Sequence, residues 1–134
     1  MTARDMSDCS FCNHVIGKRA PIAETALTIA VYDAYPLAEG HTLVLPKRHV
    51  GLLRCMTPDE QADLWAMAIR ILTARGIDPE AADHNIGVND GPFAGQTVPH
   101  VHLHIIPRRP GDVADPRGGV RWVIPDKADY WSHR

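Results

Sequence analysis

The pattern of apolar and polar positions along the chain predicts several short strands and one long helix. Strands are expected at residues 25–32, 41–47, 84–88 and 98–107, where apolar and β-branched residues cluster between turn residues. Strands around a single strong helix predict an α+β fold with a mainly antiparallel sheet. Past Pro110 the prolines interrupt any periodic pattern, so no element is assigned there.

The helix follows Thr57. Thr57 is a suitable N-cap, Pro58 suits the first helical position, and Glu60 completes a capping box. Apolar residues then recur at i, i+3, i+4 and i+7, which gives the helix one apolar face; Gly76 is expected to end it. The apolar residues are Leu64, Met67, Ala68 and Ile71.

The most informative alternation lies in the last predicted strand. His100, His102 and His104 alternate there with Val101, Leu103 and Ile105. Side chains on a strand point to opposite faces in turn, so the three histidines share one face and the apolar residues pack on a core. Three imidazoles on one surface indicate a metal site or chemistry on an anionic group.

Composition narrows the class of protein. The chain has 134 residues, which fits a single domain at 1–134, and a net charge of −2 gives no case for nonspecific binding to nucleic acid or a membrane. The first ten residues are polar and resemble no signal peptide, and no segment has the roughly 20 apolar residues of a membrane span. A cytoplasmic location is therefore expected.

Pairing the strand at 41–47 antiparallel to the histidine strand predicts two separate sites. One end would bring His49 near His100, where Cys9 and Cys12 could join them. Two thiolates and two imidazoles form the ligand set of a structural zinc site. Alternatively, the two cysteines are plain reduced thiols and His49 is a surface residue.

The other end would bring His41 near His104, beside His102, and suits phosphate chemistry. Neutral imidazole is a good nucleophile near neutral pH. In the preceding loop at 89–97, Gly91 and Gly95 allow the backbone N–H groups to approach an anion, although such a loop can also be a mere turn.

These segments resemble the histidine triad (HIT) family of nucleotide hydrolases and transferases. The run HVHLHII at 100–106 matches the family's alternating signature, and NDGPFAGQTVP at 89–99, GHTLVLPKRH at 40–49 and SFC at 10–12 resemble its other elements. The resemblance covers about residues 9–109, leaving a C-terminal tail at 110–134. It implies a HIT-like fold that pairs into a homodimer.

The resemblance also implies roles for individual residues. His102 matches the nucleophile that attacks the α-phosphate and forms a nucleotidyl-histidine, while His104 and His41 match the flanking histidines that contact phosphate. Cys9, Cys12, His49 and His100 match the ligands of a structural zinc ion in some bacterial members, and catalysis itself needs no cofactor. The positions matching the nucleotide-binding groups are Phe11 at the base, Asp33 at the ribose, and Asn89, Gly95, Gln96 and Thr97 around the phosphates.

The expected function is hydrolysis of dinucleoside polyphosphates or nucleoside phosphoramidates, with a purine nucleotide as substrate. Histidine at position 104 favours hydrolases, because related transferases carry glutamine there, and the tail resembles that of diadenosine polyphosphate hydrolases. In that tail Arg117 and Arg121 either contact the additional phosphates or are surface residues. Two alternatives remain: a nucleotide-binding or signalling module with incidental hydrolase activity, and a metal-binding protein that uses the triad as ligands.

Overall fold

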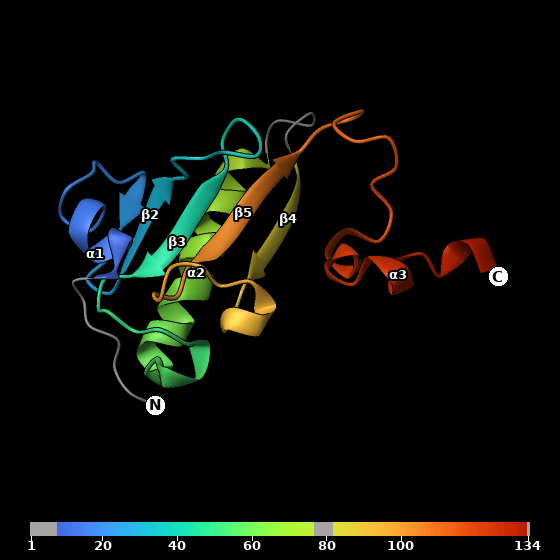
Figure 1. Ribbon diagram of the computed structural model, residues 1–134. Coiled ribbons are helices and arrows are strands. Elements are labelled where there is room, and N and C mark those ends of the chain that lie inside the picture. The colour runs from blue at the N-terminus through green and yellow to red at the C-terminus, as the bar shows by residue number, and fades with distance from the viewer. Residues whose placement is uncertain (1–7, 77–81, 134) are drawn as a thin grey trace.

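The structure is a computed structural model that describes residues 8–76 and 82–133. Within these residues the strands form one antiparallel sheet in the order β1-β2-β3-β5-β4 (Figure 1). The strands are β1 (Ala23–Glu24), β2 (Thr28–Tyr32), β3 (Thr42–Pro46), β4 (Asp83–Val88) and β5 (Leu103–Arg108). The predicted α+β class and antiparallel sheet are confirmed.

The predicted long helix is α2 (Pro58–Arg75). Thr57 and Glu60 form the expected capping box, and Gly76 is the C-cap. The helix packs on one face of the sheet, where its apolar residues meet Ala30, Val44, Leu103 and Ile105. The shorter helices are α1 (Ser10–His14) and α3 (Pro125–Ala128), with single 3-10 turns η2 (Leu53–Cys55), η3 (Pro92–Ala94), η4 (Gly119–Val123) and η5 (Trp131–His133).

The opposite face of the sheet carries a second cluster of buried residues. Ile29, Val31, Leu43 and Leu45 point to this side, and α1 covers them with Phe11 and Val15. His104 lies opposite Leu43 in the sheet, so it shares this face with the second cluster. The sheet therefore separates the main helix from the histidines.

The histidine strand begins later than the alternation predicts. β5 starts at Leu103, so His100 and His102 precede it, and residues 98–100 form a bend. Pro99 has no backbone N–H to donate to a ladder, and the Val101 N–H donates to the Val50 carbonyl at 2.8 Å, beyond the end of β3. The alternation itself persists, since Val101, Leu103 and Ile105 are all buried on the helix side.

The tail contains structure that the sequence pattern did not predict. η4, α3 and η5 follow one another after residue 118 and lie beyond β4, the last strand of the sheet (Figure 1). η4 contacts β4 and packs on α3. Within the described residues, no helix combines the length and apolar character needed to cross a membrane.

Candidate active site and metal centre

The side chain of His102 is fixed by the backbone two residues before it. Its Nδ1 lies 2.8 Å from the carbonyl oxygen of His100. A carbonyl only accepts, so Nδ1 carries the proton and Nε2 keeps its lone pair. Burial lowers the pKa of His102, which favours this neutral form. The arrangement gives a buried imidazole with a free, nucleophilic nitrogen.

Phe11 of α1 packs edge-on against this imidazole. The ring centroids of Phe11 and His102 lie 4.8 Å apart with an interplanar angle of 78°, and Phe11 makes a similar contact with His100 at 5.9 Å. Because Phe11 is itself buried, it restricts the orientation of the His102 ring. This contact could not be predicted from the residue pattern, because α1 and His102 lie about ninety residues apart.

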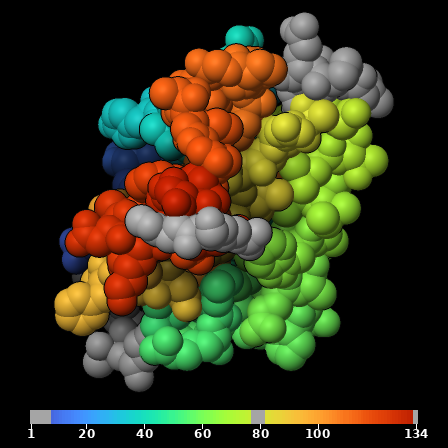
Figure 2. Space-filling view, turned by 90° about the vertical axis from the view of Figure 1, so that its right-hand side faces the viewer, coloured from blue at the N-terminus to red at the C-terminus, as the bar shows by residue number. Residues whose placement is uncertain are grey.

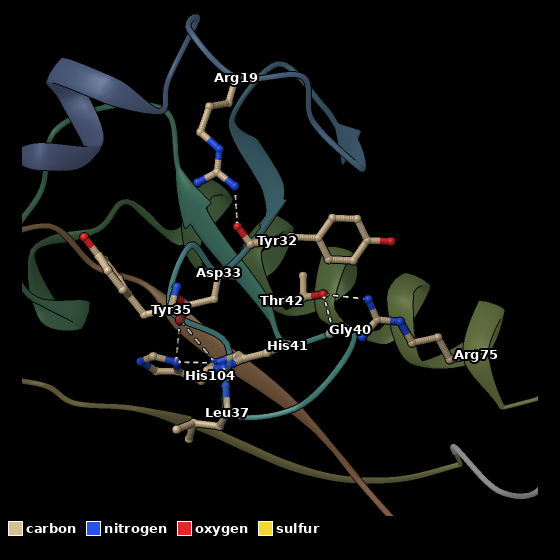
Figure 3. Close-up of polar contacts among 10 residues, drawn as sticks. All are labelled: Arg19, Tyr32, Asp33, Tyr35, Leu37, Gly40, His41, Thr42, Arg75 and His104. Atoms are coloured by element: carbon tan, nitrogen blue, oxygen red, sulfur yellow. Dashed lines mark hydrogen bonds and ion pairs between the residues drawn. The ribbon is translucent and has the colours of Figure 1, made fainter.

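His41 and His104 form a second ordered pair (Figure 3). The backbone N–H of Leu37 donates to His41 Nδ1 at 3.0 Å, so the proton of neutral His41 sits on Nε2. That Nε2–H donates to His104 Nδ1 at 2.9 Å, which leaves the proton of His104 on its own Nε2. The chain of bonds from Leu37 thus makes His104 Nε2–H a hydrogen-bond donor.

Both members of this pair are neutral near pH 7. Burial lowers the pKa of His41 against an opposing effect of Asp33. Burial, His102 and His41 together lower the pKa of His104 to about 4. Only His104 retains appreciable exposure, at 24% of its side chain, against 2% for His41. His104 is therefore the member that can meet a ligand, and His41 lies behind it.

Asp33 lies against the same two histidines. Its Oδ2 is 3.4 Å from His41 Nε2 and 3.9 Å from His104 Nδ1, and its Oδ1 accepts the N–H of Tyr35 at 2.8 Å. Asp33, His41 and His104 are close enough together to suggest a metal site. However, the Leu37 N–H occupies His41 Nδ1 and so keeps Nε2 protonated, without the lone pair that a metal requires.

The loop between β4 and β5 is held by Gln96. Its Oε1 accepts the N–H of Gly91 at 2.9 Å, and its Nε2 donates to the carbonyls of Gly51 and Val98 at 2.8 and 3.1 Å. The side-chain donors of Gln96 are therefore engaged within the protein. Both loop glycines, Gly91 and Gly95, have positive φ, and Asn89, Gly95 and Thr97 are exposed.

A second cluster lies at the other end of the histidine segment and has the geometry of a zinc site. The Sγ of Cys9 is 3.5 Å from His100 Nδ1, the Sγ of Cys12 is 3.4 Å from His49 Nδ1, and the two Nδ1 atoms are 3.3 Å apart. Tetrahedral zinc ligands at about 2.3 Å for sulfur and about 2.0 Å for nitrogen lie about 3.3–3.8 Å from one another. These residues can hold a metal ion.

The protonation of the cluster also suits zinc. His100 Nε2 donates to the Pro46 carbonyl at 2.7 Å, which leaves the lone pair on Nδ1, the atom that faces the two sulfurs. Burial lowers the pKa of His100 to about 4. Burial and the neighbouring Cys9 raise the pKa of Cys12 to about 11, so binding of a metal ion there would release a proton.

The sequence therefore predicted which residues meet but not how they are oriented. His49 contacts His100 and His41 contacts His104, as expected. The register places Leu43, rather than His41, directly opposite His104; the long imidazole side chains bridge the offset. The Leu37 N–H was missed because a backbone donor leaves no sequence signal.

The two tail arginines are engaged within the tail. Arg117 bonds to Asp115 at 2.8 Å and stacks on Trp131 at 4.9 Å. Arg121 donates to the carbonyls of Ala128 and Lys127 at 2.9 and 2.8 Å and lies over Tyr130. Neither guanidinium is directed at the histidines, which favours the interpretation of both as structural surface residues.

Comparison with known protein families decides the family. The model described as "HIT domain" matches residues 14–111, which is most of the chain. The chain belongs to the HIT domain family. It carries the three alternating histidines of that family at His100, His102 and His104, so the membership expected from the sequence is confirmed.

Curated HIT relatives include named hydrolases. The chain is 39% identical over 106 residues to the bifunctional bis(5'-adenosyl)-triphosphatase/adenylylsulfatase of Arabidopsis thaliana, covering 79% of this chain and 59% of that protein. It is 38% identical over 102 residues to an adenosine 5'-monophosphoramidase of Schizosaccharomyces pombe, covering 75% and 74%. These names agree with the prediction of a nucleotide hydrolase, although the first relative extends well beyond the matched region.

A solved HIT structure agrees with the fold and bears on the metal centre. A Zn-bound histidine triad family protein from Mycobacterium smegmatis superposes with a TM-score of 0.72 at 38% identity, covering 83% of this chain and 82% of that one. Zinc is thus present in a relative of the same fold and of similar length.

Proposed function

We propose that this protein is a nucleotide hydrolase that cleaves at the α-phosphate through a nucleotidyl intermediate on His102. The bond from His102 Nδ1 to the His100 carbonyl at 2.8 Å carries the proposal, because it directs the lone pair to Nε2. Dinucleoside polyphosphates and nucleoside phosphoramidates are the substrate classes, in keeping with the names of the relatives.

Attack by His102 accounts for both steps of the reaction. In the first, Nε2 forms a bond to the α-phosphorus while the bond to the leaving group breaks. A leaving phosphate departs as an anion and needs no proton, whereas the amine of a phosphoramidate takes up one proton from solvent as it departs. The imidazole becomes positively charged, and the His100 carbonyl at Nδ1–H stabilises that charge. Water then attacks phosphorus, the P–N bond breaks, one proton goes to solvent, and neutral His102 is restored.

The surrounding residues bind the nucleotide in this proposal. His104 donates its Nε2–H to a phosphate oxygen, and His41 holds that tautomer. Asp33 binds the ribose hydroxyls, and Phe11 borders the base. Asn89, Gly95 and Thr97 contribute donors around the phosphates, while Gln96 shapes the loop that presents them.

Substituting the nucleophile tests the proposal. His102→Ala should abolish turnover of diadenosine triphosphate and of an adenosine phosphoramidate, while AMP still binds. The matched control is His84→Ala. His84 and Ile86 are two residues apart on β4 and therefore share a face of the sheet. Ile86 packs against the helix-side core, so His84 lies on the face opposite the proposed active site. Mass spectrometry of rapidly quenched wild type should find one adenylyl group on His102. Near-normal hydrolysis by His102→Ala would refute the assignment. Very slow wild-type turnover with tight AMP binding would favour a binding module instead.

We further propose that Cys9, Cys12, His49 and His100 hold a structural zinc ion. The Nδ1 and Sγ separations of 3.3–3.6 Å support it, as does the zinc-bound relative. Metal analysis should find about one zinc per chain in wild type and in His102→Ala, and none in Cys9→Ser. Zinc lost with His102→Ala would place the ion at the triad and refute this assignment.

A homodimer and a cytoplasmic location complete the proposal. Among the residues that the structure describes, β4 pairs only with β5 and is an edge of the sheet, and edge strands readily pair with a second copy. On α2, Ile69 is also exposed. Sedimentation should show a dimer that Ile69→Lys weakens; a monomer in wild type at micromolar concentration would refute the proposed dimer.

The cysteines support the proposed cytoplasmic location. The thiols of Cys9 and Cys12 form no disulfide, which suits a reducing compartment.

A further inference from the structure

A large cavity lies between the sheet and the C-terminal tail. Its volume is about 790 Å³, within the range of pockets that bind small molecules. The floor is the histidine face of β4 and β5, and the tail segment around residues 112–122 forms the opposite wall. Figure 2 views the molecule from the side on which β4 and the tail lie, with the orange and red tail in front.

The cavity is continuous with the proposed active site. His104 and Asn89 line it, and both contact phosphate in the proposed function. From His104 the floor continues along the strand through Ile106 and Arg108. A substrate with its α-phosphate at His102 can therefore extend its leaving group past His104 and into the cavity.

Trp122 provides a flat wall whose orientation is fixed. Its Nε1–H donates to the Arg117 carbonyl at 2.8 Å. The backbone at Gly118 has φ of +93°, and a Cβ there would stand 3.0 Å from Trp131 and 3.3 Å from Trp122 Nε1, so only glycine permits this packing. The indole is nevertheless 47% exposed, which leaves part of it available to a ligand.

The charges around the cavity are already paired. Arg108 bonds to both carboxylate oxygens of Asp112, at 2.7 and 2.9 Å, and to Asn85 Oδ1 at 2.6 Å. Asp115 is likewise bonded to Arg117. No guanidinium that lines the cavity is left unpaired among the described residues, so the cavity favours a neutral planar group over a phosphate.

We propose that this cavity binds the leaving half of the substrate, with the base of a second nucleoside stacked on Trp122. The inference rests on the proposed function and narrows it: substrates with an aromatic leaving group are cleaved in preference to those with a compact one. Leu37, Val113 and Val120 also line the cavity, and their apolar side chains suit contact with a base.

Two substrates that share the adenylyl half test the proposal. Wild type and Trp122→Ala are compared on diadenosine triphosphate and on adenosine 5'-phosphoramidate with a propylamine leaving group. Base stacking on an aromatic side chain is worth about 1–3 kcal/mol, so Trp122→Ala should lower kcat/KM for diadenosine triphosphate by about 5- to 150-fold. The compact phosphoramidate should change by less than about twofold.

Control variants separate stacking from folding. Trp122→Phe keeps an aromatic face but loses the bond to the Arg117 carbonyl, and should recover most of the activity on diadenosine triphosphate. Trp65→Ala removes an exposed tryptophan on α2, across the sheet from the cavity, and should alter neither substrate.

Each other outcome would overturn the proposal in a recognisable way. Equal loss on both substrates would mean that Trp122 supports the active site only structurally. No loss on diadenosine triphosphate would mean that the cavity is not used. A shift in sedimentation with Trp122→Ala would assign the cavity to a second copy of this chain. If wild type cleaves neither substrate, the proposed function fails and this inference with it; if wild type cleaves both, only this inference is at stake.

Discussion

At the scale of single residues, backbone groups determine which ring nitrogen of each histidine carries the proton. The carbonyl of His100 takes the Nδ1–H of His102, the carbonyl of Pro46 takes the Nε2–H of His100, and the N–H of Leu37 occupies Nδ1 of His41. Neighbouring histidines thereby present opposite nitrogens, which in the proposed function are used for phosphorus at His102 and for metal at His100. Identical side chains thus acquire different chemistry from their main-chain partners.

The bond between His41 and His104 predicts an asymmetric effect of two substitutions. His41→Leu removes the donor to His104 Nδ1, so the His104 tautomer is no longer fixed. Leaving His104 Nδ1 without its donor costs about 1–3 kcal/mol, and kcat should fall about 5- to 150-fold. His41→Gln offers an amide donor in nearly the same place and should retain more activity. Steady-state kinetics on diadenosine triphosphate provide the comparison.

The prediction is wrong if His41→Leu and His41→Gln lower kcat equally while their thermal stabilities are the same. In that event the donor at position 41 is unimportant, and the buried His41 acts only by filling space.

The residues of the site could be predicted from the sequence better than their orientations could. Alternation at His100, His102 and His104, together with the resemblance, identified the side chains that meet. The residue pattern did not predict that Asp33 lies 3.4 Å from His41, because tertiary packing determines the conformation of the loop that carries Asp33. The arginines of the tail were ambiguous for the same reason: their partners, Asp115 and the carbonyls of Lys127 and Ala128, are settled only once the tail folds.

At the scale of elements, α2 was predicted well because its signals are local. Thr57, Pro58 and Glu60 fix its start, and the i, i+3, i+4 spacing fixes its buried face. Strand β5 was predicted less well, since its first residue depends on where β3 stops pairing. The short helices of the tail were not predicted, because packing of η4 on α3 stabilises them and their sequence has no periodic apolar pattern.

Glu60 combines two roles at the start of α2, and this predicts a pH-dependent stability. It completes the capping box and accepts two bonds from Arg48, at 2.7 and 3.0 Å. The bonds from Arg48 are the main reason that the pKa of Glu60 falls to about 2. A carboxylate with a lowered pKa stabilises the folded state above its unfolded pKa of about 4.3. That contribution is lost as the pH falls from there towards 2.

Glu60→Gln should therefore cost about 1 kcal/mol at pH 7. Glutamine preserves the capping box but not the charge, and Arg48 is half exposed, so solvent screens the pair. Urea unfolding at pH 7 and pH 3 measures the effect: the gap between wild type and variant should narrow at the lower pH. The matched control Asp59→Asn, at the neighbouring first-turn position, should show a smaller gap. A gap that stays constant between the two pH values would show that the ion pair adds no stability.

At the scale of the whole molecule, the proposed zinc and catalytic sites share their supporting residues. His100 faces the cysteines with its Nδ1 while its carbonyl holds His102. Phe11 lies between Cys9 and Cys12 in the chain and packs against the His102 ring. An ion that fixes α1 on the sheet would therefore fix the nucleophile from two sides.

Removal of the ion should consequently lower kcat without destroying the fold. The sheet and α2 have their own core, separate from the cluster around α1, so circular dichroism of the chelated protein should remain that of a folded α+β domain. Supporting residues behind a reactive group commonly change activity about 10- to 100-fold, and kcat should fall by that factor with a smaller change in KM. Phe11→Leu in the zinc-loaded protein should reproduce part of the loss while retaining the metal. ¹⁵N NMR of His102 gives the independent measurement: in wild type Nδ1 should carry the proton, and chelation should mix the two tautomers. An unchanged kcat and an unchanged His102 spectrum after complete removal of zinc would show that the two sites are neighbours without being coupled.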